Sequence, residues 1–397
     1  MQTASARIES SAILRQAIAL APRLREHAAE AERLRRLPAQ SVAELKDAGV
    51  FKILRSRRHG GAQASLREFV DIVAALGKGC GSSAWCAGVA NAHNWLLGIF
   101  PERAQDDVVR GNPDAIIAAV IGPRGGARRT ADGFILESGF WPFCSCVPFA
   151  DWVVLGAGVH DEAGEVIDEG DFLIPASEVE IRDDWDVVGL MASGSNSVVA
   201  KNLFVPAHRY LSMRAALAGE APGAGIHDGS LYRSAIVPVL ALALAPPALG
   251  IAEGALEDFT RRLPGKQVAY TQGEVQIEMP TTHLQVGEAA MKIDVARMLL
   301  HRAAAAIETA AASGDKMDLR LRARVRMDAA YAVRQCLEAV EILMLASGGS
   351  GIAAGNPVQR AWRDLHAINL HGLLGLETNL EMYGRLILGL PQNTPLI

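Results

Sequence analysis

The order in which helical and strand patterns follow one another constrains the fold of this chain more than any single motif. Residues 5–110 carry the apolar spacing of amphipathic helices. Near residue 114 this gives way to short β-branched or alternating runs, such as GFILESGFW and DWVVLGAGV, separated by Gly, Pro and Asp. Long Ala- and Leu-rich helical patterns return near residue 231 and continue to the end. We therefore predict an α+β fold in which a small sheet lies between two helical parts.

These pattern changes predict three domains in the 397 residues. We expect an N-terminal α-helical domain at 1–113 and a central β-sandwich or barrel domain at 114–212. A C-terminal four-helix bundle is expected at 213–397.

Charge and hydropathy exclude several classes of function. A net charge of −5 gives no basic surface for nucleic acid. The first residues, MQTASARIESSAILRQA, contain no continuous apolar segment, so we predict no signal peptide and a cytoplasmic protein. Prolines at 238, 246 and 247 interrupt the longest apolar run, residues 235–252. That run is therefore interpreted as a buried pair of helices and not as a membrane span.

Cysteine usage indicates neither disulfides nor a metal site. The chain has 5 cysteines, an odd number, and without an export signal they are expected to be reduced thiols. Cys144 and Cys146 are separated by one residue, which is not the CxxC spacing of redox or zinc sites, and no second pair accompanies them. We predict no bound metal.

Two histidines, His366 and His371, stand among leucines and isoleucines in RDLHAINLHGLLGLE. On one continuous helix they would point about 140° apart, so they would not chelate one ion from one face. A core histidine satisfied by a hydrogen bond is the simplest interpretation of either one. An imidazole with a pKa near 6.5 can also hydrogen-bond or accept a proton at neutral pH.

A series of short segments, in this order, resembles one superfamily over residues 31–389. The segments are AERLRRLP, HGG, GSSAW, AHNWLLGIF, FCSC, SGSNSVVAKNLFVPAHR, LYR, ALGIAEG, QRAWRDLHAINLH and MYGRLILG. They resemble the acyl-CoA dehydrogenase superfamily, and within it the oxygenase component of two-component p-hydroxyphenylacetate hydroxylase and its relatives. The resemblance implies the acyl-CoA dehydrogenase fold and a monooxygenase reaction. In that reaction an externally reduced flavin and O2, through a C4a-hydroperoxyflavin, hydroxylate an aromatic, phenol- or indole-like substrate. The fold usually assembles as a homotetramer.

The same alignment separates oxygenases from dehydrogenases. Counted from Arg363-Asp364, the Tyr and the catalytic Glu that many acyl-CoA dehydrogenases carry fall on His371 and Gly372. The carboxylate base is therefore missing at this position, whereas the hydroxylases have a catalytic histidine that aligns with His371. An acyl-CoA dehydrogenase with a displaced base is the alternative. A catalytically idle helical assembly module is a third hypothesis.

The resemblance also assigns roles to individual residues. His93 aligns with the histidine that holds the substrate phenol oxygen, and Ser145 with a serine whose hydroxyl lies against flavin N5; with His371 they form the expected catalytic set. Further substrate-side residues are Trp85, Trp95, Ala119 and His366, although an aromatic core stripe explains the tryptophans equally well. Ala119 replaces a serine of the p-hydroxyphenylacetate enzyme, which counts against that particular substrate. The family's Ser-Ser-Gly-Cys is here Cys-Ser-Cys-Val, so its glycine falls on Cys146.

The flavin is expected to contact a further set of residues. Arg233 aligns with a flavin-site arginine and is assigned to the flavin across a subunit contact, with a surface salt bridge as the simpler interpretation. Lys266 replaces a second arginine. The remaining expected contacts are Phe143, Ser145, and the small-residue turns Ser193-Gly194-Ser195 and Gly348-Gly349-Ser350-Gly351, with Gly348, Gly349 and Gly351 offering backbone N–H groups.

No GxGxxG follows a strand in this sequence, so we expect no nicotinamide site. The reduced flavin would then come by diffusion from a separate NAD(P)H:flavin reductase, as FMNH2 or alternatively as FADH2. A phenol, an indole, a polyketide, an aminosugar and a thiophene all remain possible substrates.

Overall fold

The computed structural model describes residues 9–397, so the first eight residues of the stretch interpreted as lacking a signal peptide lie outside it. Helices precede and follow one sheet, and the predicted α+β fold is confirmed. The first helices are α1 (Ser10–Leu34), α2 (Ala39–Asp47), α3 (Leu66–Gly77), α4 (Gly81–Leu97) and α5 (Glu102–Gly111). The strands are β1 (Ile117–Val120), β2 (Gly125–Arg129), β3 (Gly133–Trp141), β4 (Trp152–His160), β5 (Val166–Pro175), β6 (Glu180–Ile181), β7 (Val198–Pro206) and β8 (Tyr210–Ser212). The later helices are α6 (Met213–Leu217), α7 (Ile236–Leu244), α8 (Pro246–Arg261), α9 (Pro280–Ser313), α10 (Leu319–Ala346), α11 (Pro357–Asn369) and α12 (Leu376–Ile387).

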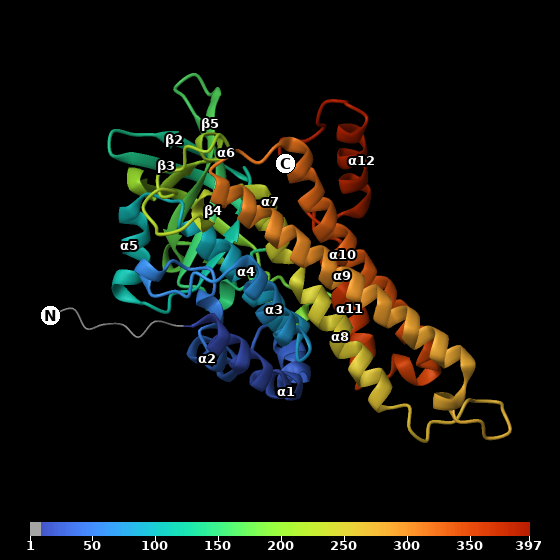
Figure 1. The fold of residues 1–397 in the computed structure, drawn as a ribbon. Helices are drawn as coiled ribbons and strands as arrows, with labels where there is room; N and C mark the ends of the chain where they lie inside the picture. Colours follow the sequence, from blue (N-terminus) through green and yellow to red (C-terminus); the bar gives the residue numbers. More distant parts are fainter. Residues whose placement is uncertain (1–8) are drawn as a thin grey trace.

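The long C-terminal helices form a bundle that extends away from the sheet (Figure 1). Helices α8, α9, α10 and α11 pack side by side, and α12 packs on α10. Helix α9 has 34 residues and is therefore about 51 Å long. The N-terminal helix α3 packs on α8 and joins the first helices to the bundle. The division into three domains at 113/114 and 212/213 remains a prediction.

The sheet has eight strands in the order β6-β7-β3-β2-β4-β5-β8, and β1 pairs with β4 beside β2. Strands β1 and β2 pair in parallel with successive halves of the same edge of β4, whereas the other pairs are antiparallel. Alternate residues of each strand point to opposite faces. On β1, Ala119 therefore points to one face and its neighbour Ala118 to the other.

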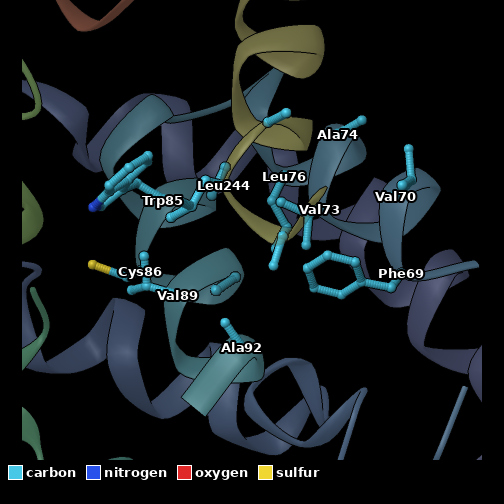
Figure 2. Packing of buried hydrophobic residues seen from close by; sticks show 14 of the residues in the cluster. Phe69, Val70, Val73, Ala74, Leu76, Trp85, Cys86, Val89, Ala92 and Leu244 are labelled. Atoms are coloured by element: carbon cyan, nitrogen blue, oxygen red, sulfur yellow. The ribbon is translucent and has the colours of Figure 1, made fainter. Parts of the chain in front are cut away.

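The two faces of the sheet belong to different hydrophobic clusters. One face, with Leu136, Val153 and Phe172, forms a cluster within the sheet region. The other face, with Ala119 and Val154, joins the large core shared by the helices. Within that core Figure 2 shows α3 and α4 side by side, with Phe69 and Val73 of α3 facing α4. The side chains of Trp85 and Cys86 leave α4 on another side, away from Phe69. This second side of α4 faces the candidate site.

One apolar stretch, Ile236–Arg261, has the length and composition of a membrane-crossing helix, with a mean hydropathy of 1.8 in its most apolar window. However, 89% of that window is buried inside the fold. The stretch also consists of two helices, because Pro246 and Pro247 begin α8 directly after α7 ends. The predicted buried helix pair is therefore confirmed.

Candidate active site

Three serines from two separate turns form one buried hydrogen-bonded chain. Ser145 lies in the turn after β3, and Ser193 and Ser195 lie between β6 and β7. The Ser145 Oγ is 2.8 Å from the Ser195 Oγ, which is 2.7 Å from the Ser193 Oγ. Trp85 of α4 donates its indole N–H to the Ser145 Oγ at 3.0 Å. Residues that were expected to contact flavin and substrate are thus joined directly.

Backbone hydrogen bonds hold these two turns together. The amide of Cys146 donates to the carbonyl of Ser193 at 3.0 Å, and the amide of Cys144 donates to the carbonyl of Asn196 at 3.1 Å. Phe143 and Cys146 both have positive φ, 64° and 71°. Cys146 therefore adopts the left-handed conformation, which a glycine reaches without a Cβ clash and other residues adopt less often.

Two thiols beside this turn, those of Cys86 and Cys146, are buried and donate to backbone carbonyls. Cys146 donates to the carbonyl of Cys86 at 3.6 Å, and Cys86 donates to the carbonyl of Ser193 at 3.7 Å. Burial raises the pKa of Cys146 well above its ordinary value, so the thiolate is not formed at neutral pH. Cys146 therefore packs the turn as a neutral thiol.

His93, on α4, is a buried neutral imidazole with a defined tautomer. Its Nδ1 lies 2.9 Å from the carbonyl oxygen of Ile117, which can only accept, so Nδ1 carries the proton. Burial lowers the pKa of His93 to about 4, which keeps the ring neutral at physiological pH. The free Nε2 is consequently a hydrogen-bond acceptor.

His371 has the opposite tautomer. The amide of Leu373 donates to its Nδ1 at 3.2 Å, so in the neutral ring the proton is on Nε2. Burial lowers the pKa of His371 to about 4, which again favours the neutral ring. The ring centroids of His371 and Trp85 are 5.8 Å apart. His371 therefore brings an N–H donor to the side of Trp85, which also contacts Ser145.

The two C-terminal histidines do not share a helix, which corrects the helical spacing assumed from the sequence. Helix α11 ends at Asn369, and His371 lies in the following turn. His366 is on α11, with its Nε2 2.8 Å from the Oε1 of Glu341 on α10. The indole N–H of Trp362 donates to the same oxygen at 2.8 Å. His366 thus belongs to a half-exposed cluster between α10 and α11, and its role toward the substrate remains a prediction.

Three other expected residues, Ala119, Trp95 and Arg233, lie on β1, on α4 and in the 3-10 turn Leu231–Arg233. Ala119 is buried on β1, opposite Val154. The indole N–H of Trp95 donates to the carbonyl of Leu231 at 2.9 Å, so this tryptophan attaches α4 to the turn that carries Arg233. Arg233 itself is exposed.

The remaining expected flavin contacts follow the ends of α8 and α10, two helices of the bundle that extends away from the sheet (Figure 1). Lys266 donates to the carbonyl of Ser347 at 2.9 Å, directly before the 3-10 turn Gly348–Ile352 that contains Gly348, Gly349 and Gly351. Burial lowers the pKa of Lys266. Lys266 also lines a small cavity with Arg262, Ser347, Ser350 and Asn356. Within residues 9–397, no hydrogen bond joins Lys266 or these glycines to Ser145.

Two buried carboxyl groups were missed as functional candidates in the sequence. Asp364 lies on the buried face of α11, between Ala361 and Ile368, and that position was the available signal. Asp171 lies within β5, where a run of buried residues surrounds it. Among residues 9–397 no group of three or more His, Cys, Asp or Glu is placed to hold a metal ion.

The fold and its sequence place the chain among known proteins. Residues 242–375 match the family Acyl-CoA dehydrogenase, C-terminal domain. The chain is 35% identical to the flavin-dependent monooxygenase oxygenase subunit HsaA of Rhodococcus jostii over 374 residues, which cover 94% of this chain and 97% of that protein. It is also 35% identical to the FADH2-dependent resorcinol hydroxylase oxygenase component of a Rhizobium species, over 92% of this chain and 91% of that protein. The structure of XiaF from a Streptomyces species, in complex with FADH2 and glycerol, superimposes with a TM-score of 0.92 at 29% identity, covering 97% of each chain.

These similarities define an oxidoreductase with the acyl-CoA dehydrogenase fold. Within that class, the chain belongs to the oxygenase subunits of flavin-dependent monooxygenases. The expected family is confirmed, and so is the expected class of enzyme.

Proposed function

We propose that this oxygenase hydroxylates a phenol, using O2 and a reduced flavin delivered by a separate NAD(P)H:flavin reductase. The names of the relatives support a two-component system, because each is called an oxygenase subunit or component. FADH2 is favoured over FMNH2, because it is the flavin named for the resorcinol hydroxylase and for XiaF. When bound, the reduced flavin supplies the electrons that activate O2.

The donors at Ser145 fit a flavin ring. An indole N–H can only donate, so the Ser145 Oγ accepts from Trp85. When Ser195 also donates to Ser145, both lone pairs of Ser145 are used and its own O–H is free to donate to a ring nitrogen. Ser193 can then donate to Ser195, which orders the whole chain of hydroxyls toward one outward donor. Phe143, 69% exposed beside this turn, offers an apolar surface for the ring.

The two histidines are suited to opposite tasks. His93 presents an acceptor, which can receive the O–H of a phenol and increase the electron density of its ring. With a pKa of about 4 it orients and polarises the hydroxyl and does not hold a full proton. His371 presents a donor, which can stabilise negative charge on an oxygen at the flavin side. Complementary tautomers thus assign His93 to the substrate and His371 to the oxygen that is transferred.

The tautomer of His93 is the observation that carries the choice of substrate. Only a group with an O–H or N–H donor can satisfy its Nε2, which favours phenols and indoles over thiophenes. The names of the relatives direct the choice to phenols. Dehydrogenation is disfavoured, because the hydrogen-bond partners found for Ser145, His93 and His371 include no carboxylate.

We further propose a cytoplasmic homotetramer in which a neighbouring chain supplies the segment that carries Lys266. Three apolar side chains, Leu284, Met291 and Met298, recur every seventh residue along α9 and are 74%, 62% and 70% exposed. A heptad stripe of this kind fits a second helix. A second chain packed on this stripe would bring its own Lys266 to the flavin site. This would explain why the expected flavin contacts of one chain lie in two separate places.

The test is a titration of the purified protein with FADH2 and FMNH2 under anaerobic conditions, followed by the addition of O2 and resorcinol. We expect tight binding of reduced flavin and a hydroxylated product. Hydrogen peroxide without any product, for a panel of phenols, would contradict the proposal. Reduction of protein-bound FAD by an acyl-CoA would establish the dehydrogenase alternative, and failure to bind any flavin would favour the idle assembly module.

A further inference from the structure

Asp364 contacts the turn between β6 and β7 that carries Ser193 and Ser195, which we call the serine turn. Its Oδ1 accepts the amide N–H of Leu190 at 2.7 Å, and the side chain is buried. Leu190 has a positive φ of 50°, which is uncommon for a leucine and is held only where the surroundings determine it. Ser193 follows three residues later. The carboxyl group of Asp364 therefore fixes the backbone conformation at the start of this turn.

The residues beside Asp364 bring the turn against α11. Arg363 donates to the carbonyl of Val188 at 2.6 Å and to Glu32 of α1 at 2.8 Å. A Cβ atom at Gly189 would overlap the carbonyl oxygen of Arg363, so only glycine permits this approach. The segment from Val188 to Leu190 thus has three consecutive contacts with the Arg363-Asp364 pair.

The other oxygen of Asp364 lies against the first turn of α4. A Cβ atom at Gly81 would stand 2.5 Å from the Asp364 Oδ2. The neighbouring Ser82 accepts the amide of Ala192 through its Oγ at 3.3 Å, which ties the same helix end to the serine turn. Helix α4 carries Trp85 in this part and His93 two turns further on. A carboxyl group at the N-terminal end of a helix is also favoured by the helix dipole.

Asp364 therefore lies where three parts of the proposed site meet. One is the serine turn, one is α4 with Trp85, and the third is α11 itself, which leads within seven residues to His371. We propose that Asp364 is a positioning residue that fixes the serine turn and α4 against α11, so that the Ser145 hydroxyl and the His371 imidazole face the same flavin. The inference rests on the proposed flavin site but concerns a residue that touches neither flavin nor substrate.

The test compares Asp364→Ala with Asp364→Asn, which keeps an oxygen that can accept the Leu190 N–H. Asp328→Ala is the matched control, because Asp328 is a buried acid of α10 that pairs with Arg302 in the bundle. Two quantities are measured: amide hydrogen exchange across residues 188–196, and the dissociation constant of FADH2 under anaerobic conditions. Gly189→Ala is a second way to separate the turn from α11 if Asp364→Ala does not fold.

We expect Asp364→Ala and Gly189→Ala to accelerate exchange in 188–196 and to weaken FADH2 binding, each by roughly tenfold. Asp364→Asn should recover most of both, and Asp328→Ala should change neither. Unchanged exchange in 188–196, or an acceleration spread evenly over the whole chain, would overturn the inference. If the unmodified protein binds no reduced flavin, the proposed function fails, and the exchange data alone then decide whether Asp364 fixes the turn.

Discussion

The indole N–H of Trp85 donates to the hydroxyl of Ser145 at 3.0 Å, across 60 positions of sequence. The same indole lies 5.8 Å from the ring of His371. Trp85 therefore contacts both groups proposed to act on the flavin side, Ser145 and His371. It donates a hydrogen bond to Ser145 in addition to packing beside the site. The direction of the hydrogen bonds along Ser145, Ser195 and Ser193 can therefore be tested by changing Trp85.

We predict that Trp85→Phe uncouples the reaction, because it keeps an aromatic ring but removes the indole N–H. Without the indole donor, the Ser145 hydroxyl has one more free lone pair and its proton is no longer directed outward. A hydrogen bond of this kind contributes about 1 kcal/mol, so the share of O2 released as hydrogen peroxide should rise roughly two- to tenfold. The measurement is the ratio of hydroxylated product to peroxide for each flavin oxidised.

Trp141→Phe is the matched control, because Trp141 is also buried and also donates its indole N–H, to the carbonyl of Gly156 on β4, within the cluster of the sheet region. It should cost stability without changing the ratio of product to peroxide. If both variants uncouple the reaction equally, Trp85 has no special relation to Ser145.

We predict that His93→Ala and His371→Ala separate substrate recognition from oxygen use. Loss of the His93 acceptor should lower kcat/KM for the phenol by roughly 10- to 100-fold and leave the affinity for reduced flavin unchanged. Loss of the His371 donor should leave the affinity for the phenol unchanged and increase peroxide release. The measurements are steady-state kinetics, reduced-flavin titration and peroxide assay on the same preparations.

His366→Ala shows whether the half-exposed cluster with Glu341 takes part in recognition. Because His366 is bonded to Glu341 on α10, we expect a change in phenol KM smaller than twofold. A fall in kcat/KM for the phenol as large as that of His93→Ala would show that His366 contacts the substrate.

Charged substitutions on the apolar stripe of α9 should break the assembly. We predict that Met291→Glu with Met298→Glu lowers the oligomeric state in sedimentation experiments and weakens flavin binding, because a carboxylate would be buried without a partner in a helix–helix interface. Ile18→Glu, at an apolar residue of α1 that is 59% exposed, should leave both unchanged. A dissociated variant with full flavin affinity would show that one chain holds the flavin alone.

Much of the fold follows from local pattern. The run GFILESGFW forms β3 with the same bounds, Gly133–Trp141, because its aromatic and β-branched side chains favour a strand. Strand β2, Gly125–Arg129, could not be predicted in this way, since GGARR has neither β-branched residues nor a buried alternation. It forms because β3 and β4 supply partners on both sides. Strands of this kind form because of their pairing partners, and a local sequence pattern does not reveal those partners.

The site is less visible in the sequence than the fold. Resemblance suggested Ser145, Ser193 and Ser195, but nothing local indicates that two turns 50 residues apart form one chain. The end of α11 before His371 was also hidden, because the apolar spacing continues past Asn369. Tautomers depend on a single neighbouring carbonyl or amide, which tertiary structure alone supplies. Residue type and resemblance therefore suggested which residues to expect at the site, whereas their geometry depends on contacts that only the tertiary structure supplies.

Asp171 provides the last prediction, which concerns stability. The side chain is 0% exposed, and neither carboxyl oxygen has a hydrogen-bond partner in the part of the chain that the structure describes. Burial raises the pKa of Asp171 to about 7, compared with an ordinary value near 4. Between about pH 4 and pH 7 the folded protein thus binds more protons at this site than the unfolded chain, so its contribution to the free energy of unfolding falls as the pH rises and is lowest above pH 7.

Asp171→Asn removes this cost, because the amide stays neutral. We predict that urea denaturation at pH 8 shows a gain in the free energy of unfolding of about 4 kcal/mol, and that the gain shrinks toward zero near pH 4. The pKa values of His93 and His371 are lowered, so these residues act in the opposite direction to Asp171. Their contribution to the free energy of unfolding falls as the pH falls from about 6.5 to 4. Because both histidines are present in both proteins, the difference between them isolates Asp171. Asp168→Asn, at a carboxylate bonded to Tyr210 and Ser212, should instead lower stability at both pH values, and a similar gain there would refute the assignment to burial.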